Sequence, residues 1–213
     1  DIIDIGGEST RPGAERVSEA EEIERTIPVI AELAKHGVKI SIDTMRASTA
    51  EVAIKAGASI INDVSGGLAD PHMLQTAARL GVPYIAMHWR GQSKDMNSKA
   101  IYSDVVIDVI SELQERITAA LDAGIEVGNL IIDPGLGFAK DAEHNWEIID
   151  SIDSFVDLGY PVLVGASRKR FLGGDSPDER EQATIDLTKR LATTGVWAVR
   201  VHSVKPHKEV LAQ

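Results

Sequence analysis

Residues 38–63 read VKISIDTMRASTAEVAIKAGASIIND, and this stretch decides the fold. It contains two short apolar runs, Val38–Ile42 and Ser59–Asn62, which end in the polar pairs Asp43-Thr44 and Asn62-Asp63. The runs are nearly continuous in their apolar character, which is typical of strands that are buried on both faces of a parallel sheet covered by helices. The stretch therefore predicts two parallel strands with polar residues at their carboxyl ends.

The same pattern recurs along the chain. Five further runs have the length and composition of buried strands: Ile2–Ile5, Pro83–Met87, Leu130–Ile132, Pro161–Val164 and Trp197–Val201. The segments between the runs have helical spacing of apolar residues, and no linker or change in composition divides them. We therefore expect one α/β domain over residues 1–213.

Helix start and stop signals separate the runs. Ser18 and Glu21 form a capping-box signature, and Asp70-Pro71 predicts an N-cap followed by a proline at the first helical position. Apolar residues from Val106 to Leu121 predict a long amphipathic helix. Asp141 is expected to cap the next helix, with Trp146 and Ile149 on its inner face, and Ala183, Leu187 and Leu191 mark the last full helix.

Seven runs are one short of the eight strands of a (β/α)₈ barrel. Because the chain opens on a strand-like run, we expect such a barrel with its first strand and the following loop outside this sequence. A doubly wound open sheet is the structural alternative, because periodicity does not distinguish it from a barrel.

Every run delivers polar residues at its carboxyl end. In a parallel barrel these ends meet on one face, where binding and catalytic groups are found. Arg200 and His202 alternate with Val199 and Val201, so both cations point to one side of their strand. A buried arginine without a partner is costly, which favours a functional pocket at that position.

Most of these residues also have a simpler interpretation. Asp43 is also a possible helix cap, Asn62-Asp63 and Asp133-Pro134-Gly135 possible turns, Arg168-Lys169-Arg170 a possible solvated charge run, and His88 a possible core histidine. Their combination is nevertheless coherent. One group offers acceptors and an amide, and another offers cations: Asp43, Asn62 and Asp133, and Lys169, Arg200 and His202. Together they fit a ring rich in N–H donors that bears a phosphate-type leaving group.

The composition narrows the class of protein. The net charge of −11 argues against nucleic acid as the main partner, because phosphate backbones select basic faces. The sequence has no cysteine, so it offers neither disulfides nor a thiolate metal site, which fits a cytoplasmic protein. Its apolar runs are shorter than the roughly 18 residues of a membrane span, so we expect no membrane partner.

Seven motifs, in order, resemble the dihydropteroate synthase family, with a weaker likeness to its actinobacterial members. They are residues 4–13 (DIGGESTRPG), 41–44 (SIDT), 61–64 (INDV), 87–88 (MH), 133–138 (DPGLGF), 167–171 (SRKRF) and 199–202 (VRVH). The resemblance implies a transferase of folate biosynthesis. Such an enzyme condenses 6-hydroxymethyl-7,8-dihydropterin diphosphate with p-aminobenzoate, giving 7,8-dihydropteroate and diphosphate.

The resemblance also implies roles for individual residues. Asp43, Asn62, Asp133 and Lys169 would hold the pterin, and Met87, Phe138 and Gly165 would shape its slot. Arg200 and His202, assisted by Arg11, would bind the diphosphate. Thr10, Arg11 and Pro12, on a mobile loop, would form the p-aminobenzoate site with Phe138, Lys169 and Arg170. Of these, Asp43, Asp133, Lys169, Arg200 and His202 are the expected catalytic residues.

Magnesium is the implied cofactor, but the asparagine that places it in the family lies before residue 1, so we expect no metal ligand in this chain and no activity of the chain by itself. The family also implies a homodimer. Ser203 follows His202 where family members usually carry aspartate, so either activity is lowered or Ser203 serves as the partner of that histidine.

Three other functions fit parts of the pattern. A methyltetrahydrofolate-dependent methyltransferase domain would share the Asp43, Asn62 and Asp133 pocket but would not need the Arg200 and His202 pair. A non-catalytic pterin-binding paralogue would have the fold without turnover. A phosphosugar barrel enzyme would carry glycine-rich phosphate loops after its last two strands, where this chain has cationic side chains.

Overall fold

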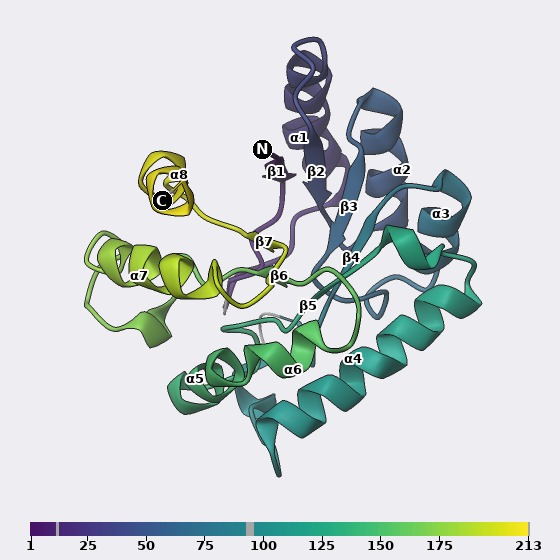
Figure 1. The fold of residues 1–213 in the computed structure, drawn as a ribbon. Coiled ribbons are helices and arrows are strands. Elements are labelled where there is room, and N and C mark those ends of the chain that lie inside the picture. The colour runs from purple at the N-terminus through teal and green to yellow at the C-terminus, as the bar shows by residue number, and fades with distance from the viewer. Residues whose placement is uncertain (12, 93–95, 213) are drawn as a thin grey trace.

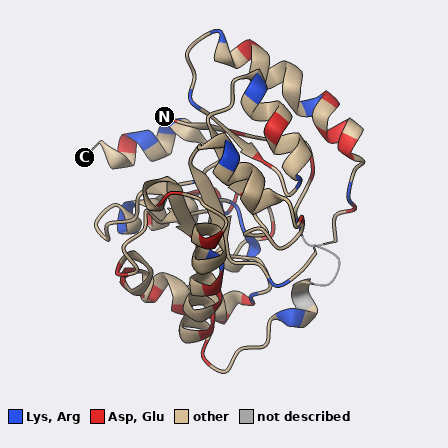
Figure 2. Cartoon of the chain, turned by 90° about the vertical axis from the view of Figure 1, so that its right-hand side faces the viewer, with Lys and Arg blue, Asp and Glu red and all other residues tan. Residues whose placement is uncertain are grey.

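The computed structural model describes residues 1–11, 13–92 and 96–212, except for the side chain of Asn97. Parallel strands occupy the centre of the molecule and helices surround them (Figure 1). The charged residues belong mainly to these outer helices and to the loops, while the central strands contain few of them (Figure 2). In the described ranges, no helix is long and apolar enough to cross a membrane.

All seven predicted strands are present, within about two residues of their predicted bounds. They are β1 (Ile3–Gly6), β2 (Ile40–Asp43), β3 (Ile60–Asp63), β4 (Tyr84–Met87), β5 (Leu130–Asp133), β6 (Leu163–Val164) and β7 (Ala198–Val199). Strands β1 to β5 form one parallel sheet in sequence order, and β6 pairs with β7. A single bridge between Ile132 and Val162 connects the two sheets. The order is therefore sequential, as a barrel requires, without the order reversal of a doubly wound sheet.

Helices connect successive strands. The α-helices are α1 (Glu19–Ala34), α2 (Ala47–Ala56), α3 (Met73–Leu80), α4 (Val105–Asp122), α5 (Ala142–Asp150), α6 (Ile152–Val156), α7 (Glu181–Leu191) and α8 (Val204–Leu211). Short 3₁₀ turns are η1 (Met96–Lys99), η2 (Val127–Asn129) and η3 (Arg170–Leu172).

Two of the predicted caps are confirmed. The Ser18 side chain accepts a hydrogen bond from the Glu21 amide, and Asp141 forms a capping box with His144. The prediction for Asp70 is wrong. Helix α3 begins at Met73, and the Asp70 carboxylate accepts from the amide of Ala47, the first residue of α2, at 2.8 Å. Asp70 thus satisfies a free amide of a neighbouring helix, a partner that only the folded chain supplies.

Two other expectations differ from the structure. Trp146 is 38% exposed and packs edge-to-face against Phe171, whereas Ile149 on the same helix is fully buried. In addition, α7 is not the last helix, because α8 follows the final strand directly after His202-Ser203. A short helix that contains Pro206 has a weak sequence signal, since proline is tolerated only in its first turn.

The strands separate two kinds of packing. Side chains such as Ile42, Ile61 and Ile132 point outward and form the main core against the helices. The alternate side chains point inward, where Ile60, Ile85, Ile131 and Leu163 form a second buried cluster, against which Ile2 and Ala198 pack. Because this cluster joins residues from both ends of the strand order, the inner faces converge on one interior. The polar site lies above it.

Candidate active site

An open cavity lies at the carboxyl ends of the strands. It is lined by residues from four strands and from the loops that follow the strands: Thr10, Asp43, Asn62, Val64, Met87, Asp133, Phe138, Gly165, Ser167, Lys169, Arg200 and His202. Ten of these residues were singled out from the sequence, and the fold brings them together although almost 200 positions separate the first from the last.

One wall of the cavity is acidic. Asp43 ends β2, and Asn62 lies beside it on β3 in the sheet register. Asp4 of β1 lies next to both, because the Asn62 amide nitrogen is 3.3 Å from each Asp4 carboxylate oxygen and the Ser41 hydroxyl also donates to Asp4. Burial, and next the charge of Asp4, raise the pKa of Asp43 to about 8. This wall therefore favours a ligand that is cationic or rich in hydrogen-bond donors.

Asp133 ends β5 and continues the acidic wall. Its Oδ1 accepts from the Gly135 amide at 2.7 Å, so the Asp-Pro-Gly segment is a turn as well as a part of the cavity. Burial raises the pKa of the Asp133 carboxyl, against the effect of the Lys169 charge. Of the pair Asn62-Asp63, one residue belongs to the cavity and the other belongs to a turn. Asn62 lines the cavity, whereas Asp63 is fully buried and accepts from Ser65, Gly67 and Tyr84.

Lys169 faces Asp133 across the cavity. Its ammonium group donates to the Leu136 carbonyl and lies 4.7 Å from the centroid of the Phe138 ring. Burial lowers the pKa of Lys169 to about 8, with Asp133 opposing the shift. A Cβ atom on Gly165 would lie 3.9 Å from both the Lys169 ammonium and the Asp133 carboxylate. The missing side chain thus keeps open the space between the two charges.

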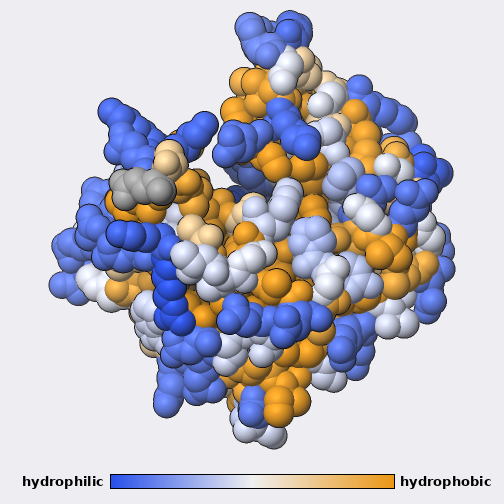
Figure 3. All heavy atoms as spheres, in the orientation of Figure 1, coloured by the Kyte–Doolittle hydropathy of each residue, from blue (hydrophilic) through white to orange (hydrophobic). Residues whose placement is uncertain are grey.

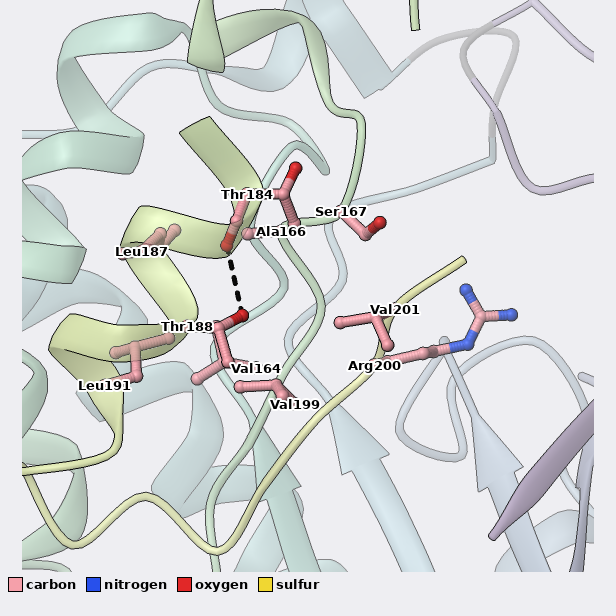
Figure 4. A pocket seen from close by; sticks show the side chains of 10 residues that line it. All are labelled: Val164, Ala166, Ser167, Thr184, Leu187, Thr188, Leu191, Val199, Arg200 and Val201. Atoms are coloured by element: carbon pink, nitrogen blue, oxygen red, sulfur yellow. Dashed lines mark hydrogen bonds between the residues drawn. The ribbon is translucent and has the colours of Figure 1, made fainter. Parts of the chain in front are cut away.

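Arg200 brings a cation into the same cavity, in contact with the acidic wall. Figure 4 shows Val199 and Val201 facing α7, while Arg200 points the other way, as the strand alternation predicts. The Arg200 guanidinium donates from Nε to Asp4 Oδ2 at 2.6 Å and from a terminal nitrogen to Asp43 Oδ2 at 3.2 Å. These two carboxylates raise its pKa against the effect of burial.

His202 also lines the cavity. Its Nδ1 lies 2.9 Å from the Ser167 hydroxyl, which also accepts from the His202 amide at 3.2 Å. Burial, and next Arg200, Arg168 and Arg11, lower the pKa of His202. Ser203 does not serve as the partner of His202, because its hydroxyl accepts from Arg168 at 2.9 Å. The partner of His202 is Ser167, which comes from another strand.

Two predicted residues of the described chain do not line the cavity. Arg11 and Arg170 are exposed, and neither lines the cavity, although Arg11 is close enough to act on the pKa of His202. Pro12 lies outside the described residues. The loop that carries Thr10 is tied down by Glu8, whose carboxylate accepts from Arg16 and Arg46, each at 2.9 Å.

The sequence analysis missed Asp4, Val64 and Ser167 as site residues. Asp4 had a detectable signal, because it is a charged residue inside an apolar run. It also lies two residues before Gly6, so both residues face the same side of the strand. Val64 had none, since an aliphatic residue after a strand normally indicates packing. Ser167 was overlooked because it precedes the charge run Arg168-Lys169-Arg170, which is the stronger signal.

His88 is a core histidine. It is 1% exposed, and both ring nitrogens have partners, Glu112 at 2.9 Å and Lys140 at 2.8 Å. The charge run at residues 168–170 is not uniformly solvated, since Lys169 is in the cavity and Arg168 pairs with Glu181 at 3.0 Å. Only Arg170 fits that simpler interpretation.

Comparison with known proteins agrees with this geometry. The family model described as pterin binding enzyme matches residues 1–202. Parallel strands with a polar cavity at their carboxyl ends, and an acidic wall suited to a donor-rich ring, define the same class. The chain therefore belongs to the family of pterin-binding enzymes.

The relatives narrow the class further. The chain is 46% identical to the dihydropteroate synthase of Mycobacterium leprae over 99% of this chain and 78% of that protein. It matches the dihydropteroate synthase of Xanthomonas albilineans solved with 4-aminobenzoic acid at a TM-score of 0.94 and 40% identity, covering 100% of this chain and 77% of that one. The same enzyme solved with 7,8-dihydropteroate matches at 0.89 and 35%, with the same coverage. Within the pterin-binding family, this is a dihydropteroate synthase, a transferase of folate biosynthesis.

Proposed function

We propose that the cavity binds 6-hydroxymethyl-7,8-dihydropterin diphosphate and p-aminobenzoate and joins them with release of diphosphate. The amine nitrogen of p-aminobenzoate forms a bond to the methylene carbon of the pterin, the carbon–oxygen bond to diphosphate breaks, and the amine loses a proton. The observation that carries the proposal is that carboxylate and amide side chains and cationic side chains line one cavity. Solved relatives bound to 4-aminobenzoic acid and to 7,8-dihydropteroate support the two substrates.

In this proposal the acidic wall holds the pterin. Asp43, Asn62 and Asp133 accept hydrogen bonds from the ring, and Lys169 donates to it, while Met87, Phe138 and Gly165 bound the slot. As the bond to diphosphate breaks, positive charge develops on the methylene and the ring. The side chains of Asp43 and Asp133 face that charge and stabilise it more than they stabilise the ground state, which lowers the barrier.

Arg200 and His202 bind the departing diphosphate. In the present structure Arg200 pairs with Asp4 and Asp43. A bound diphosphate competes for this guanidinium with charge-assisted hydrogen bonds of the same kind. Thr10 and Arg11, with Pro12, Arg170, Phe138 and Lys169, form the p-aminobenzoate side in this proposal. The free amine is already a nucleophile at neutral pH, so no general base is needed.

Dihydropteroate formation by the full-length protein tests this assignment, with Asp43→Asn, Lys169→Ala and the exposed control Lys55→Ala. We expect the first two changes to lower kcat/KM by about 100-fold or more, since each removes a group that holds the pterin in this proposal. Lys55→Ala should leave kcat/KM within about twofold, because Lys55 pairs only with Glu51 on the surface of α2. Full activity in both cavity variants would refute the site. An unsubstituted protein that binds pterin diphosphate but makes no product would favour a non-catalytic paralogue.

We also propose that residues 1–213 form a single domain and part of a (β/α)₈ barrel. The sequential parallel order and the shared inner cluster of β3 to β7 with Ile2 support closure. The contact between Arg200 after β7 and Asp4 on β1 supports the same arrangement. The eighth strand would come from a segment that precedes residue 1.

Three further expectations remain proposals. Magnesium stays a proposed cofactor, and no step here depends on it; among the described residues, no group of three or more His, Asp or Glu side chains is arranged to hold a metal ion. A homodimer is supported by exposed apolar side chains late in the chain, such as Trp197, Val204 and Leu211. Apolar residues also reach the surface in the view of Figure 3. The absence of cysteine fits a cytoplasmic protein.

A further inference from the structure

The turn that carries Phe138 into the cavity is held from behind by a buried lysine. Lys140 is 8% exposed and does not line the cavity. Its Nζ lies 2.8 Å from Nδ1 of His88, 3.1 Å from the Gly135 carbonyl oxygen and 3.1 Å from the Phe138 carbonyl oxygen. A charged ammonium group has three N–H donors, and here each one has an acceptor.

The histidine that faces Lys140 is fixed in turn. Because Nδ1 of His88 accepts from Lys140, Nε2 carries the proton and donates to Glu112 Oε2 at 2.9 Å. Burial, and next the charge of Lys140, lower the pKa of His88 to about 4, so the ring is neutral at pH 7. Arg90 holds the Glu112 carboxylate, with Nε 3.0 Å from both oxygens. A continuous chain of hydrogen bonds therefore runs from the outer loop after β4 to the turn after β5.

The turn needs this support because its backbone is strained and crowded. Gly135 and Gly137 have φ values of +69° and +75°, and Ala139 has +48°, which costs a residue with a side chain about 1 kcal/mol. A Cβ atom on Gly135 would lie 2.4 Å from the His88 carbonyl oxygen. On the other side, the Gly137 amide donates to the Asn145 side chain at 2.6 Å. The carbonyl groups of Gly135 and Phe138 thus point inward, and both accept hydrogen bonds from Lys140.

The same turn positions two site groups. It carries the Phe138 ring in the cavity wall, and its Leu136 carbonyl accepts from the Lys169 ammonium. Asp43, Asn62 and Arg200 belong to other strands and do not depend on it. Loosening the turn would therefore move one side of the cavity and leave the acidic wall of β2 and β3 and Arg200 after β7 in place.

We propose that Lys140, with neutral His88 as its acceptor, is a positioning residue that sets the Phe138 and Lys169 side of the cavity, and so the binding of p-aminobenzoate. The proposal rests on the assignment of p-aminobenzoate to that side. Lys140 touches neither substrate and acts through the two carbonyls of the turn. His88 is part of the same unit, which gives the Met87-His88 motif a purpose beyond core packing.

The test measures steady-state kinetics of the full-length protein with Lys140→Met, Lys140→Gln and the matched control Lys55→Met. Lys140→Met should raise KM for p-aminobenzoate roughly 10-fold, the usual cost of losing an outer partner of a site residue. KM for pterin diphosphate should rise less than KM for p-aminobenzoate, because Asp43, Asn62 and Arg200 lie on other strands, although Asp133 and Lys169 contact the turn. Lys140→Gln retains two donors and should recover part of the loss. Lys55→Met should match the unsubstituted protein.

Because Lys140→Met leaves buried acceptors unpaired and lowers stability, His88→Gln provides a second approach from outside the turn. The same selective rise in KM for p-aminobenzoate in this variant would support the proposal. Equal rises in both KM values, or KM values unchanged in folded Lys140→Met protein, would overturn it. Product formation by the unsubstituted protein tests the proposed function separately, because it does not depend on the identity of residue 140.

Discussion

Two layers of side chains, two residues apart along each strand, face the same interior with opposite chemistry. In the lower layer Ile60, Ile131 and Leu163 pack together and exclude water. In the upper layer the corresponding residues are Asn62, Asp133 and Gly165, which line the cavity. The strand geometry is the same in both layers. The same strands therefore contribute to stability with their lower side chains and to the chemistry of the site with their upper side chains. Changes in the two layers should consequently fail in different ways.

The largest effect is expected from Asp133→Asn in the upper layer. The change keeps the shape of the side chain but removes the negative charge opposite Lys169, so kcat/KM should fall about 100- to 1000-fold. The free energy of unfolding should not fall by more than about 1 kcal/mol, because burial already disfavours the charged carboxylate. Product formation and urea unfolding measure the two quantities, with exposed Asp157→Asn as control. A large loss of stability would show that the upper layer also supports the fold.

Ile131→Ala, in the layer below, should have the opposite signature. It removes buried methyl groups from the inner cluster, so the free energy of unfolding should fall by about 2–5 kcal/mol. The protein that remains folded should retain kcat/KM within about threefold. Urea unfolding compares this variant with Val127→Ala, which changes an aliphatic side chain that is 62% exposed. A loss of activity in fully folded Ile131→Ala protein would break the separation of the layers.

The pH dependence of stability probes the upper layer alone. The pKa of Asp43 is about 8 in the folded protein and about 4 in an unfolded chain. Between these values the folded state retains a proton that the unfolded state loses. The contribution of Asp43 to the free energy of unfolding is therefore complete below pH 4 and is lost as the pH rises through about 8. Asp43→Asn should remove this slope, so its curve of unfolding midpoint against pH should be flatter than that of the unsubstituted protein. Parallel curves would refute the shift.

The smallest effect is expected at the outer end of the polar layer, where a serine contacts His202. Ser167 contacts the histidine, whereas neighbouring Ser203 contacts Arg168. Ser167→Ala should raise KM for pterin diphosphate about fivefold, which corresponds to about 1 kcal/mol for one hydrogen bond. Ser203→Ala should change it by less than about twofold. The reverse order would show that Ser203 orients the histidine after all.

The sequence predicted most of the site because its signals are local. Polar residues at the ends of buried runs, such as Asp43, Asn62, Asp133 and Arg200, follow from strand periodicity and from the meeting of parallel strand ends. The roles assigned to them remain predictions. The helix starts at Ser18 and Asp141 were also readable, because a cap lies within three residues of its partner. Trp146 was not, since only the packing of α5 beside Phe171 decides which of its faces is covered.

By itself the sequence determined the parallel α/β class, the seven strands and the polar residues at their tips, because periodicity and end signals act over a few residues. Only the tertiary structure decided the partners: Asp70 at the start of α2, Ser167 beside His202, Asp4 beneath Arg200, and Lys140 between His88 and the Phe138 turn. These contacts join groups that lie 2 to 196 positions apart. Buried polar groups take whichever complementary partner the fold brings within about 3 Å, and no local pattern specifies that choice.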